Sequence, residues 1–598
     1  MPGLILEEKY YQCASEEKKV GPAKGTKNRA IIGRLHILGL LVAVILLRQT
    51  WNSQFLTKTK TGPENGSQLP FGLANSTLNW IPCGSRFECA NLSVPLNHLN
   101  HSDERRASIA VTRYLASVQD SRTGTLIFNP GGPGGSGTGS TYRVGPLLDT
   151  ILQGRYNILG FDPRGVNKTL PSVHCALSPT TRSSLDHILS STAPSQHLHD
   201  IGIWDAIAQL LASSCATNSH SAVTATNDDS DVLPFVNTPS VARDMAAIID
   251  ALRASQAPYG HHHNVAYWGF SYGTNLGTIF TALFPDKLSR TILDGIRSPF
   301  DAREIYTWGY TSLASQNDAF DGYFEICERV GKERCPLATG REGGAKKVVM
   351  DLLMRLYERP LPVVGGTGSG EAGLVTFYDY KEILYDTLCV PRAWRYFADI
   401  TMDLLHGNGT SFLRTLKIAS GGSEAGTAVL CTDAVPATNY SLASWKEYVR
   451  NMTALSFVAG DSRALDTLPC RHWGAVPNER WLGDFEGMEL HTPVLMIGNT
   501  YDPATPLASA RRLVGRMGRN AVLLEQRSYG HCSVAAVSSC TYDVTLDYLL
   551  NGNLPEVGKV CEVDDREYGD YFPGSQKSAA EMSLLQKVLA GVVDEIKT

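Results

Sequence analysis

The chain has 598 residues, of which 43% are hydrophobic and 19% charged, and its formal net charge is -5. This composition is typical of a globular protein with several domains, or with one core and a large insertion, and it excludes a disordered chain. No long basic block or stripe of basic and aromatic residues occurs, so nucleic acid is not an expected partner.

The N-terminus predicts a membrane anchor. Residues 1–30 are polar and partly basic, and an apolar run follows at 31–48. We expect a cytoplasmic tail at 1–30, a signal anchor or transmembrane helix at 31–48 and a stalk at 49–80. A cleaved signal peptide is the main alternative and would make the protein secreted; a buried helix is the third. With either signal, the catalytic body is lumenal or extracellular.

Cysteines and glycosylation sequons also indicate export. Cys13 precedes the apolar run and 12 cysteines follow it, an even number that fits disulfides in an oxidising compartment. Free buried thiols are the alternative, and the pairing stays open. Some cysteines are close neighbours: Cys83/Cys89, Cys327/Cys335 and Cys532/Cys540. The glycosylation candidates all follow the apolar run: Asn65, Asn75, Asn91, Asn100, Asn167, Asn408, Asn439 and Asn451.

Apolar runs bounded by turn residues predict strands that are covered on both faces. Helical patterns separate these runs; one begins at Thr238-Pro239, where we expect an N-cap and a first turn. Strands alternating with helices indicate a parallel α/β sheet. The predicted strands lie at 107–114, 124–129, 156–161, 265–270, 290–295, 492–499 and 521–526.

The chain becomes mostly helical in pattern between about 300 and 480, as in the segments 346–358 and 381–400. A helical insertion between two parts of one sheet explains this pattern, and an amphipathic helix is expected at 583–596. The expected organisation is a core at 81–299, a helical cap at 300–480, the rest of the core at 481–565 and a C-terminal tail or helix at 566–598.

The stretch VAYWGFSYGTNLG, Val265 to Gly277, contains the motif G-x-S-x-G with Ser271 at its centre. A predicted strand precedes the motif and helical spacing follows it. A tight strand-to-helix turn, allowed by the two glycines, presents a serine hydroxyl beside the N–H groups of the helix N-terminus. The motif alone also fits an ordinary turn, but its context favours Ser271 as a nucleophile.

A nucleophilic serine needs a general base and an acid that orients the base. On this kind of sheet the expected chain order is Ser, then Asp or Glu, then His. Asp502 follows one predicted strand and His531 follows the next. Taken singly, Asp502 fits a turn and His531 a surface loop, but their order and context predict a triad with Ser271. Thr505 is expected to cap the helix after Asp502 and to steady that loop.

A glycine-rich loop, FNPGGPGGSGTGS at 128–140, follows a predicted strand. Its unobstructed N–H groups predict an oxyanion hole made by Gly132 and Tyr272. No Lys-Ser/Thr follows and the glycine spacing is not that of a dinucleotide fold, so nucleotide binding is not expected. In the next motif, GFDPRGV, Asp162 and Arg164 are expected to pair and to brace this loop.

Several separated motifs, in this order, resemble the secreted tripeptidyl aminopeptidase-like branch of the α/β-hydrolases, which is related to the proline iminopeptidases. They are NPGGPGGSG, GFDPRGV, WGFSYGTNLGTIFTALFPDKLSRTILDG, TPVLMIGNTYDPATPLASARRL and YGHCSV. The resemblance covers residues from about 80 to 565. It implies an α/β-hydrolase fold, with a mostly parallel sheet flanked by helices and a largely helical cap. It also implies Ser271 as nucleophile, His531 as base and Asp502 as its orienter.

The resemblance further implies exopeptidase activity on short peptides with a free α-amino group, bound under the cap. A cap carboxylate should then hold the substrate ammonium. Asp301, Glu304, Asp318 and Glu325 are acidic candidates, but none matches a family motif, so the substrate-binding residues stay unassigned.

The expected function is therefore a serine aminopeptidase acting on peptides through an acyl-enzyme. A carboxylic ester hydrolase or lipase-like enzyme is the first alternative, because the same triad cleaves esters. A catalytically silent adhesion or binding ectodomain is the second. No cofactor is expected, and no metal, since no C-x-x-C pair or His/Cys cluster with zinc spacing occurs. His531 must be neutral to act as a base, so activity should fall at low pH. The oligomeric state stays open.

Overall fold

The computed structural model describes residues 77–219, 231–255, 264–364, 372–419, 423–437, 440–564 and 571–572. They belong to one compact unit, Leu69–Thr598. The expected tail, anchor and C-terminal helix lie outside these residues, as do most of the stalk and the sequons at Asn65, Asn75 and Asn439. None of the helices in the described ranges is long and apolar enough to cross a membrane.

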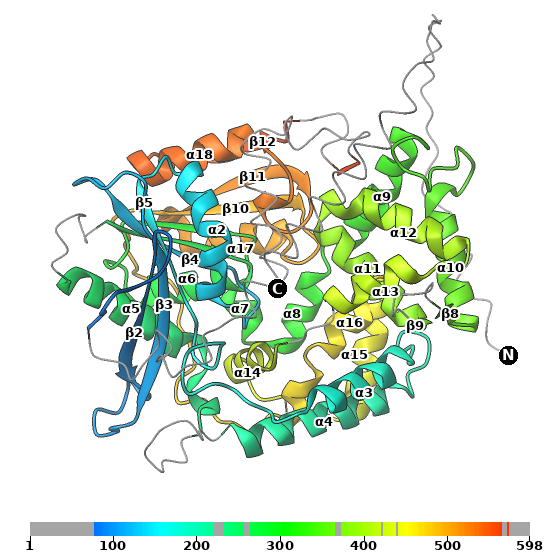
Figure 1. The fold of residues 1–598 in the computed structure, drawn as a ribbon, viewed down its shortest axis with the longest axis horizontal. Helices are drawn as coiled ribbons and strands as arrows, with labels where there is room; N and C mark the ends of the chain where they lie inside the picture. The colour runs from blue at the N-terminus through cyan, green and yellow to red at the C-terminus, as the bar shows by residue number, and fades with distance from the viewer. Residues whose placement is uncertain are drawn as a thin grey trace, which may run out of the picture. The chain divides into compact units, whose positions relative to one another are not determined.

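A ten-stranded sheet runs through the core in the order β1-β2-β3-β5-β4-β6-β7-β10-β11-β12 (Figure 1). The pairs β1–β2, β2–β3 and β3–β5 are antiparallel, and all other neighbours are parallel. Strands β4, β5 and β6 are buried at every position, which explains their continuous apolar sequences. The predicted strands and the α/β class are confirmed. The strands are β1 (Ile81–Gly84), β2 (Phe87–Pro95), β3 (Arg106–Tyr114), β4 (Gly124–Asn129), β5 (Tyr156–Phe161), β6 (Val265–Phe270), β7 (Arg290–Asp294), β10 (Val494–Tyr501), β11 (Ala521–Tyr529) and β12 (Val560–Glu562).

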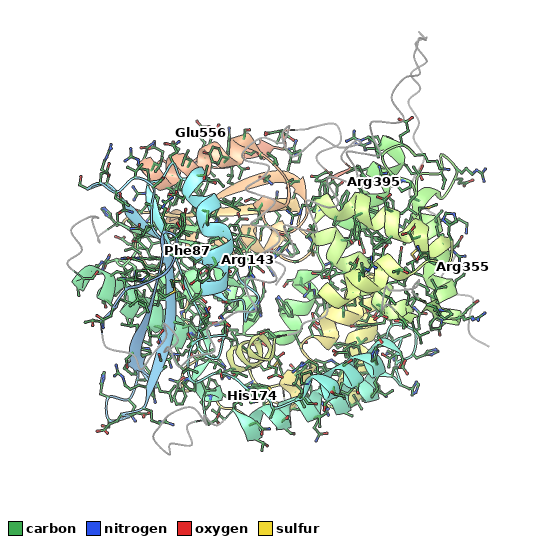
Figure 2. The ribbon with its side chains drawn as sticks, viewed as in Figure 1. Phe87, Arg143, His174, Arg355, Arg395 and Glu556 are labelled. Carbon is green, nitrogen blue, oxygen red and sulfur yellow. A yellow bond between two sulfur atoms is a disulfide. The ribbon has the colours of Figure 1, made fainter. Side chains whose placement is uncertain are left out.

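Helices cover both faces of the sheet. Buried side chains of α5, α6 and α17 share one hydrophobic cluster with the strands, and those of α2 and α18 share another. Side chains fill the space between the layers (Figure 2); the ring centroid of Phe87 in β2 lies 4.8 Å from those of Tyr114 and Tyr142. The helices are α2 (Gly137–Ile151), α5 (Thr238–Ala254), α6 (Tyr272–Leu283), α17 (Leu507–Met517) and α18 (Ser539–Asn551).

The predicted N-cap of α5 is wrong by one residue. Asn237, not Thr238, caps the helix, because Asn237 Oδ1 accepts the Ser240 N–H at 2.9 Å. Thr238 is the first helical residue, and its hydroxyl donates to Asp433 at 2.5 Å. The Thr238 hydroxyl, which the sequence pattern assigned to the N-cap, therefore binds Asp433, a residue far away in the sequence.

Helices and one small hairpin fill the chain between β7 and β10, and they share the largest hydrophobic cluster. Buried residues of α4, which precedes β6 in the sequence, belong to the same cluster. The elements are α3 (Pro179–Ser190), α4 (Ile201–Asn218), α7 (Pro299–Ala302), α8 (Ile305–Ser312), α9 (Gln316–Val330), α10 (Gly344–Glu358), β8 (Leu361–Val364), β9 (Ala372–Val375), α11 (Phe377–Cys389), α12 (Trp394–Leu405), α13 (Thr410–Ala419), α14 (Glu424–Asp433), α15 (Leu442–Leu455) and α16 (Gly460–Leu465). Short 3-10 turns are η1 (Leu233–Phe235), η2 (Pro391–Ala393), η3 (Leu468–His472), η4 (Gly518–Asn520) and η5 (Ser533–Ala535).

The helical pattern at 381–400 is divided between two helices, α11 and α12. Pro391 lies between them and opens the 3-10 turn η2. A proline cannot donate a backbone hydrogen bond and clashes with the preceding helical turn, so the helix ends before it. The expected helical pattern is therefore present on both sides of a break at Pro391.

The helical elements contact the core next to its glycine loop and next to β10. A Cβ atom added to Gly134 would lie only 2.7 Å from the Gly426 N of α14. The Gln316 side-chain amide of α9 donates to the Pro503 carbonyl. With the Thr238–Asp433 hydrogen bond, these contacts hold the helices against the carboxyl ends of the central strands.

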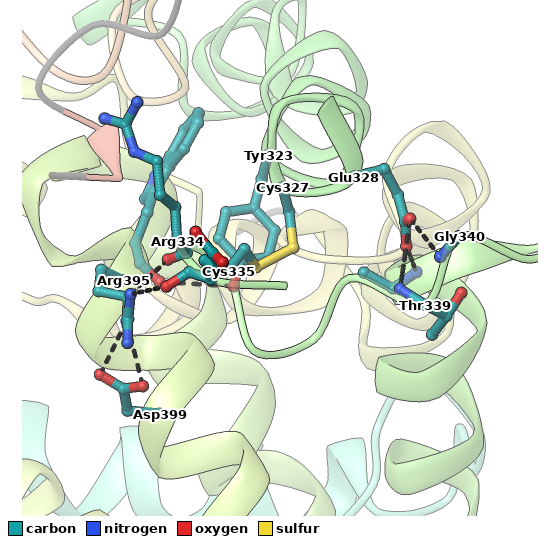
Figure 3. The surroundings of a disulfide bond; sticks show 12 residues. Tyr323, Cys327, Glu328, Arg334, Cys335, Thr339, Gly340, Arg395 and Asp399 are labelled. Carbon is teal, nitrogen blue, oxygen red and sulfur yellow. Dashed lines mark hydrogen bonds and ion pairs between the residues drawn. A yellow bond between two sulfur atoms is a disulfide. The ribbon is translucent and has the colours of Figure 1, made fainter. Parts of the chain in front are cut away.

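Five disulfides crosslink the body: Cys83–Cys89, Cys175–Cys215, Cys327–Cys335, Cys431–Cys470 and Cys540–Cys561. Such a set is typical of proteins from oxidising compartments. The Cys327–Cys335 bond closes the turn between α9 and α10 (Figure 3). In the same turn, Glu328 accepts the N–H groups of Thr339 and Gly340, each at 3.0 Å. Cys532 keeps a buried thiol, while its sequence neighbour Cys540 bonds to Cys561.

The described sequons differ in accessibility. Asn100, Asn408 and Asn451 are exposed, and their glycosylation stays a prediction. Asn91 lies half-buried on β2, where its amide donates to Ser108 at 3.0 Å. The Asn167 amide is exposed but makes a hydrogen bond to Asp162 at 2.9 Å.

Arg164 does not pair with Asp162, so that expectation is wrong. The fully buried Arg164 guanidinium binds Asp244 of α5 through bonds of 2.5 and 2.8 Å, and donates to the Pro95 carbonyl at 2.7 Å. Burial would raise the pKa of Asp244, but the charges and hydrogen bonds of Arg164 and His98 lower it overall. The ion pair therefore fastens α5 to the end of β2.

Arg164→Leu should lower the free energy of unfolding by about 3–5 kcal/mol, because Asp244 would remain as a buried carboxylate without its guanidinium. Urea unfolding followed by tryptophan fluorescence measures this loss. The double variant Arg164→Leu/Asp244→Leu should lose less than the sum of the two single variants, since it buries no unpaired charge. Fully additive losses would contradict the coupling.

Candidate active site

Ser271 lies on the turn between β6 and α6, with φ 53° and ψ -120°. This backbone conformation is strained for a residue with a Cβ atom. The flanking glycines are needed for close packing: a Cβ on Gly269 would lie 2.5 Å from the Gly273 carbonyl oxygen, and one on Gly273 would lie 2.8 Å from Asn129 Oδ1. The predicted strand–turn–helix context of Ser271 is thus present.

Asp502 and His531 follow β10 and β11 and bind each other. His531 Nδ1 lies 3.1 and 3.0 Å from the two Asp502 carboxylate oxygens. Asp502 is fully buried and also accepts the N–H groups of Ala504, Thr505 and Cys532 at 2.8, 2.8 and 2.9 Å. Burial alone would raise the pKa of Asp502, but the charge and hydrogen bonds around it lower its pKa overall, chiefly through His531.

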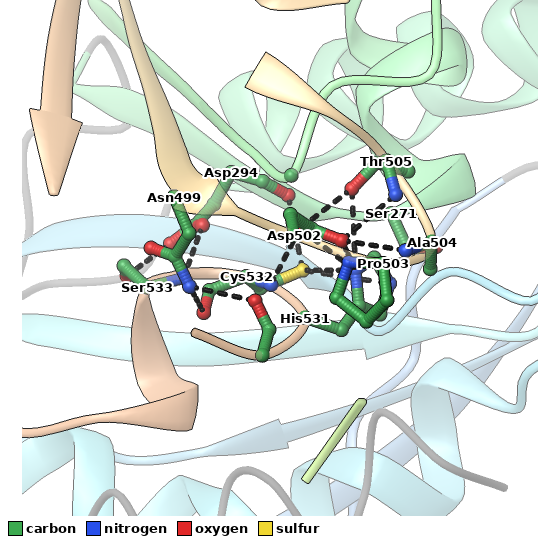
Figure 4. A network of polar contacts seen from close by, with 12 residues as sticks. Ser271, Asp294, Asn499, Asp502, Pro503, Ala504, Thr505, His531, Cys532 and Ser533 are labelled. Atoms are coloured by element: carbon green, nitrogen blue, oxygen red, sulfur yellow. Dashed lines mark hydrogen bonds and ion pairs between the residues drawn. The ribbon is translucent and has the colours of Figure 1, made fainter. Parts of the chain in front are cut away.

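The structure places the three predicted residues after the carboxyl ends of β6, β10 and β11, at the same edge of the sheet (Figure 4). Ser271 N donates to the Asp294 carbonyl at the end of β7. Gly295, which follows Asp294, packs on His531: a Cβ atom added to Gly295 would lie 3.4 Å from His531 Cε1. Within the described part of the chain, no hydrogen bond joins the Ser271 hydroxyl to His531. The Asp502–His531 half of the arrangement is therefore formed, and the serine lies beside it.

The glycine loop lies directly against the Ser271 turn. A Cβ on Gly131 would lie 2.5 Å from the Phe270 carbonyl oxygen and 3.2 Å from Tyr272 N, so only glycine fits there. The Gly131 N–H donates to Asn129 Oδ1 at 3.0 Å. Among the described residues, the N–H groups of Gly132 and Tyr272 have no acceptor, which leaves both available to a ligand.

Asp162 braces the segment that follows the glycine loop. Its carboxylate accepts hydrogen bonds from Ser136 Oγ at 2.7 Å, Thr138 N at 3.0 Å and Thr138 Oγ1 at 2.9 Å. These residues form the N-cap and first turn of α2. The expected bracing role therefore holds for Asp162 alone.

Thr505 does not cap α17, whose N-cap is Pro506. The Thr505 hydroxyl instead donates to Asp502 at 2.9 Å and lies 3.2 Å from His531 Nδ1. The predicted capping role is wrong, but Thr505 does hold the loop through its contacts with Asp502.

The sequence analysis missed a second buried carboxylate, Asp294, at the end of β7. Asp294 accepts the Ser533 N–H at 2.8 Å and the Ser533 hydroxyl at 2.5 Å. Burial raises its pKa to about 7, and the nearby charge of Asp502 contributes to this rise. Its place near the carboxyl end of the predicted strand 290–295, in TILDG, was an available signal, because carboxyl ends of parallel strands meet at one edge of the sheet.

Cys532, next to His531, is a further missed residue. Its buried Sγ lies 3.6 Å from His531 Nδ1 and donates to the Asp294 carbonyl at 3.4 Å. Burial, with Asp294 and Asp502 nearby, raises the pKa of this thiol. In the described ranges, Asp502, His531 and Cys532 form a group whose possible metal-ligand atoms lie within 4.8 Å of one another. Asp502 and His531 already bind each other, so these atoms are engaged within the protein.

The four predicted cap carboxylates do not come together. Asp301 is buried and pairs with Arg512 at 2.8 Å, while Glu304, Asp318 and Glu325 are exposed. None forms the buried acidic site that sequence reasoning sought among them.

A different set of cap carboxylates does cluster, on α11 and next to α16. Burial and the charges of Asp466, Asp386 and Asp461 raise the pKa of Glu382 to about 8. Glu382 Oε1 is a buried oxygen without a hydrogen-bond partner. Asp461 pairs with the buried Lys381, and the half-exposed Asp466 pairs with Arg463 at 3.2 Å. Glu382 is therefore a recessed carboxyl with an unused oxygen.

Comparison with known proteins agrees with this architecture. The family model described as "alpha/beta hydrolase fold" matches residues 124–333, and the one described as "TAP-like protein" matches residues 456–561. The chain is 27% identical over 509 residues to a "Tripeptidyl aminopeptidase" of Streptomyces lividans, covering 82% of this chain and 87% of that protein. It is 23% identical over 524 residues to "Serine protease Hip1" of Mycobacterium tuberculosis, covering 81% and 91%.

A third relative carries an esterase name, "Carboxylesterase B" of Mycobacterium tuberculosis, at 26% identity over 497 residues, 79% of this chain and 86% of that protein. Among solved structures, a proline iminopeptidase of Mycobacterium smegmatis aligns at 13% identity with a TM-score of 0.30, covering 77% of this chain and 97% of that one.

The chain has the α/β-hydrolase fold and is a serine hydrolase. Within that fold it is similar to the tripeptidyl aminopeptidase-like proteins, and two of its relatives are named as a tripeptidyl aminopeptidase and a serine protease.

Proposed function

We propose that the protein is a serine exopeptidase that releases short peptides from free N-termini. The observation that carries the proposal is the buried Asp502–His531 pair beside Ser271, which sits on a strained turn facing the glycine loop. Ser271 Oγ attacks the scissile carbonyl while His531 Nε2 takes its proton. The Ser271–His531 hydrogen bond forms when substrate binds, since such bonds are often long in free enzymes.

In this proposal Asp502 holds His531 through Nδ1 and stabilises the imidazolium that forms. The lowered pKa of Asp502 favours its ionised carboxylate beside His531. The N–H groups of Gly132 and Tyr272 bind the oxyanion, each contributing about 3 kcal/mol to transition-state stabilisation. His531 gives the serine proton to the leaving amine as the C–N bond breaks and the acyl-enzyme forms. Water then attacks the acyl-enzyme while His531 takes its proton, and His531 returns that proton to Ser271 Oγ as the acyl group leaves. Activity falls at low pH because a protonated His531 cannot act as a base.

We assign the substrate ammonium to Glu382. Its unused oxygen and the surrounding carboxylates suit a cation. A series of contacts runs from the nucleophile turn toward Glu382. The guanidinium carbon of Arg297 lies 5.9 Å from the Tyr272 ring centroid and 4.9 Å from that of Trp308, and the guanidinium carbon of Arg463 lies 5.9 Å from the Trp308 centroid. Arg463 pairs with Asp466 at 3.2 Å, and the charge of Asp466 acts on Glu382.

Digestion of a peptide library, read by mass spectrometry, tests this function. Peptides with free N-termini should lose a short N-terminal unit of fixed length, and acetylated copies should stay intact. Glu382→Gln should raise KM for free peptides by about 10- to 100-fold with a smaller effect on kcat, because a bound ammonium favours the ionised form of Glu382 and an amide cannot supply that charge. Glu304→Gln, on an exposed cap carboxylate, is the control and should leave KM unchanged.

Carboxylic ester hydrolysis is the second candidate, because one relative is named a carboxylesterase. Rapid cleavage of p-nitrophenyl esters with no cleavage of free peptides would favour it over the peptidase. The anchor at 31–48 and the lumenal or extracellular side of the body also remain part of the proposal; five disulfides in the body support export.

A further inference from the structure

A buried cation without a hydrogen-bond partner lies beside the nucleophile turn. Arg297, in the segment after β7, is only 7% exposed. Within the described ranges its guanidinium makes neither a hydrogen bond nor an ion pair, and its Nε is a buried atom without a partner. Burial lowers the pKa of Arg297, as expected for a desolvated cation. Such a group is costly to bury unless something binds it.

The position of Arg297 is fixed by the same elements that hold Ser271. Its N–H donates to Thr274 Oγ1 in the first turn of α6, at 2.8 Å. Its guanidinium carbon lies 5.9 Å from the centroid of the Tyr272 ring and 4.9 Å from that of Trp308. Arg297 is therefore held by the first turn of α6 and lies near the side chain of the residue that directly follows the nucleophile.

The acidic groups near Arg297 are engaged elsewhere. Asp433 accepts the Thr238 N–H at 2.7 Å and its hydroxyl at 2.5 Å, and acts on Arg297 only through space. Asp301 pairs with Arg512, and Asp466 pairs with Arg463. None of these carboxylates is within ion-pair distance of the Arg297 guanidinium, so that guanidinium is left for a ligand.

Two more arginines add positive charge here. The guanidinium carbon of Arg463 lies 5.9 Å from the centroid of the Trp308 ring, and its Nε is also buried without a partner in the described ranges. Arg480 lies close enough to Asp433 to interact with its charge, and its Nε is a third such atom. Arg463 already pairs with Asp466, whereas Arg297 and Arg480 both act through space on the single carboxylate of Asp433, so two guanidinium groups share one negative charge.

We propose that Arg297 binds a carboxylate of the peptide substrate, in a residue adjoining the scissile bond, so that the enzyme prefers acidic residues there. A guanidinium binds a carboxylate through paired, charge-assisted hydrogen bonds, and a desolvated site strengthens them. The proposal rests on the proposed peptidase function, because it assigns a substrate group to the same site.

Competition between matched peptides tests the proposal. Free-N-terminal peptides carry Glu or Gln either in the residue that supplies the attacked carbonyl or in the one that supplies the leaving amine. At one of these two positions, the wild-type enzyme should consume the Glu peptide about 10- to 100-fold faster than the matched Gln peptide. Arg297→Met should bring this ratio close to one. Because the ratio compares two substrates of one sample, it does not depend on the folded fraction; Arg297→Gln repeats the test if the Met variant is insoluble.

The outcomes separate the two proposals. A wild-type ratio near one in both positions, or a ratio that Arg297→Met leaves unchanged, overturns the carboxylate site while the peptidase stands. If no peptide is cleaved, the peptidase proposal fails, and the same comparison is made with the p-nitrophenyl monoester of glutaric acid and p-nitrophenyl butyrate. Preference for the glutarate ester that Arg297→Met abolishes supports the carboxylate site; equal rates overturn it.

Discussion

Ser271→Ala is expected to lower kcat on peptide-aminocoumarin substrates by about 10⁶-fold, as loss of a triad serine does in subtilisin. The reason is that Ser271 supplies the nucleophilic hydroxyl at the turn between β6 and α6, against which the glycine loop packs. Labelling by a fluorophosphonate probe should disappear with the activity. An alanine variant that keeps more than a hundredth of the wild-type activity would remove Ser271 from the mechanism.

A matched variant separates loss of the hydroxyl from loss of the fold. The alanine variant keeps a Cβ atom at the same φ of 53°, so its melting temperature should stay close to that of the wild type. Ser271→Gly removes the Cβ that is strained there and should be about 1 kcal/mol more stable than the alanine variant, while being equally inactive. Circular dichroism melts of the three proteins measure this order.

Asp502→Asn is expected to lower kcat by about 10⁴-fold, because an amide cannot hold His531 in the tautomer that accepts the serine proton. Asp294→Asn is the matched control. It is the same exchange at the same edge of the sheet and is equally buried, but the Asp294 carboxylate binds Ser533 and makes no hydrogen bond to His531 among the described contacts. It should therefore reduce stability more than kcat.

Steady-state kinetics and thermal melts on both variants distinguish the two carboxylates. If Asp294→Asn proved the more damaging to kcat, with Asp502→Asn nearly active, the orienting role would belong to the end of β7 instead of the end of β10. The geometry favours Asp502, since both of its oxygens lie within 3.1 Å of His531 Nδ1.

Local sequence patterns predicted the strands well because parallel strands buried on both faces are apolar at every position, and turn residues mark their ends. The G-x-S-x-G turn was also recognisable, since close packing at Gly269 and Gly273 leaves no room for a side chain. Patterns failed where a distant residue changes a local choice. Thr238 lost its capping role to a bond with Asp433, and Arg164 paired with Asp244 on α5.

The sequence by itself determined the α/β class, the positions of seven of the ten sheet strands, and the chain order of Ser271, Asp502 and His531, because these follow from periodicity and from residues next to strand ends. The strands β1, β2 and β12 at the two edges of the sheet were not predicted. Only the tertiary structure decided which charges meet. It placed Asp294 beside Cys532 and gathered carboxylates around Glu382. It also buried the Arg297 guanidinium near Tyr272 without a hydrogen-bond or ion-pair partner in the described ranges. Burial and pairing depend on residues hundreds of positions apart, and no local pattern encodes those distances.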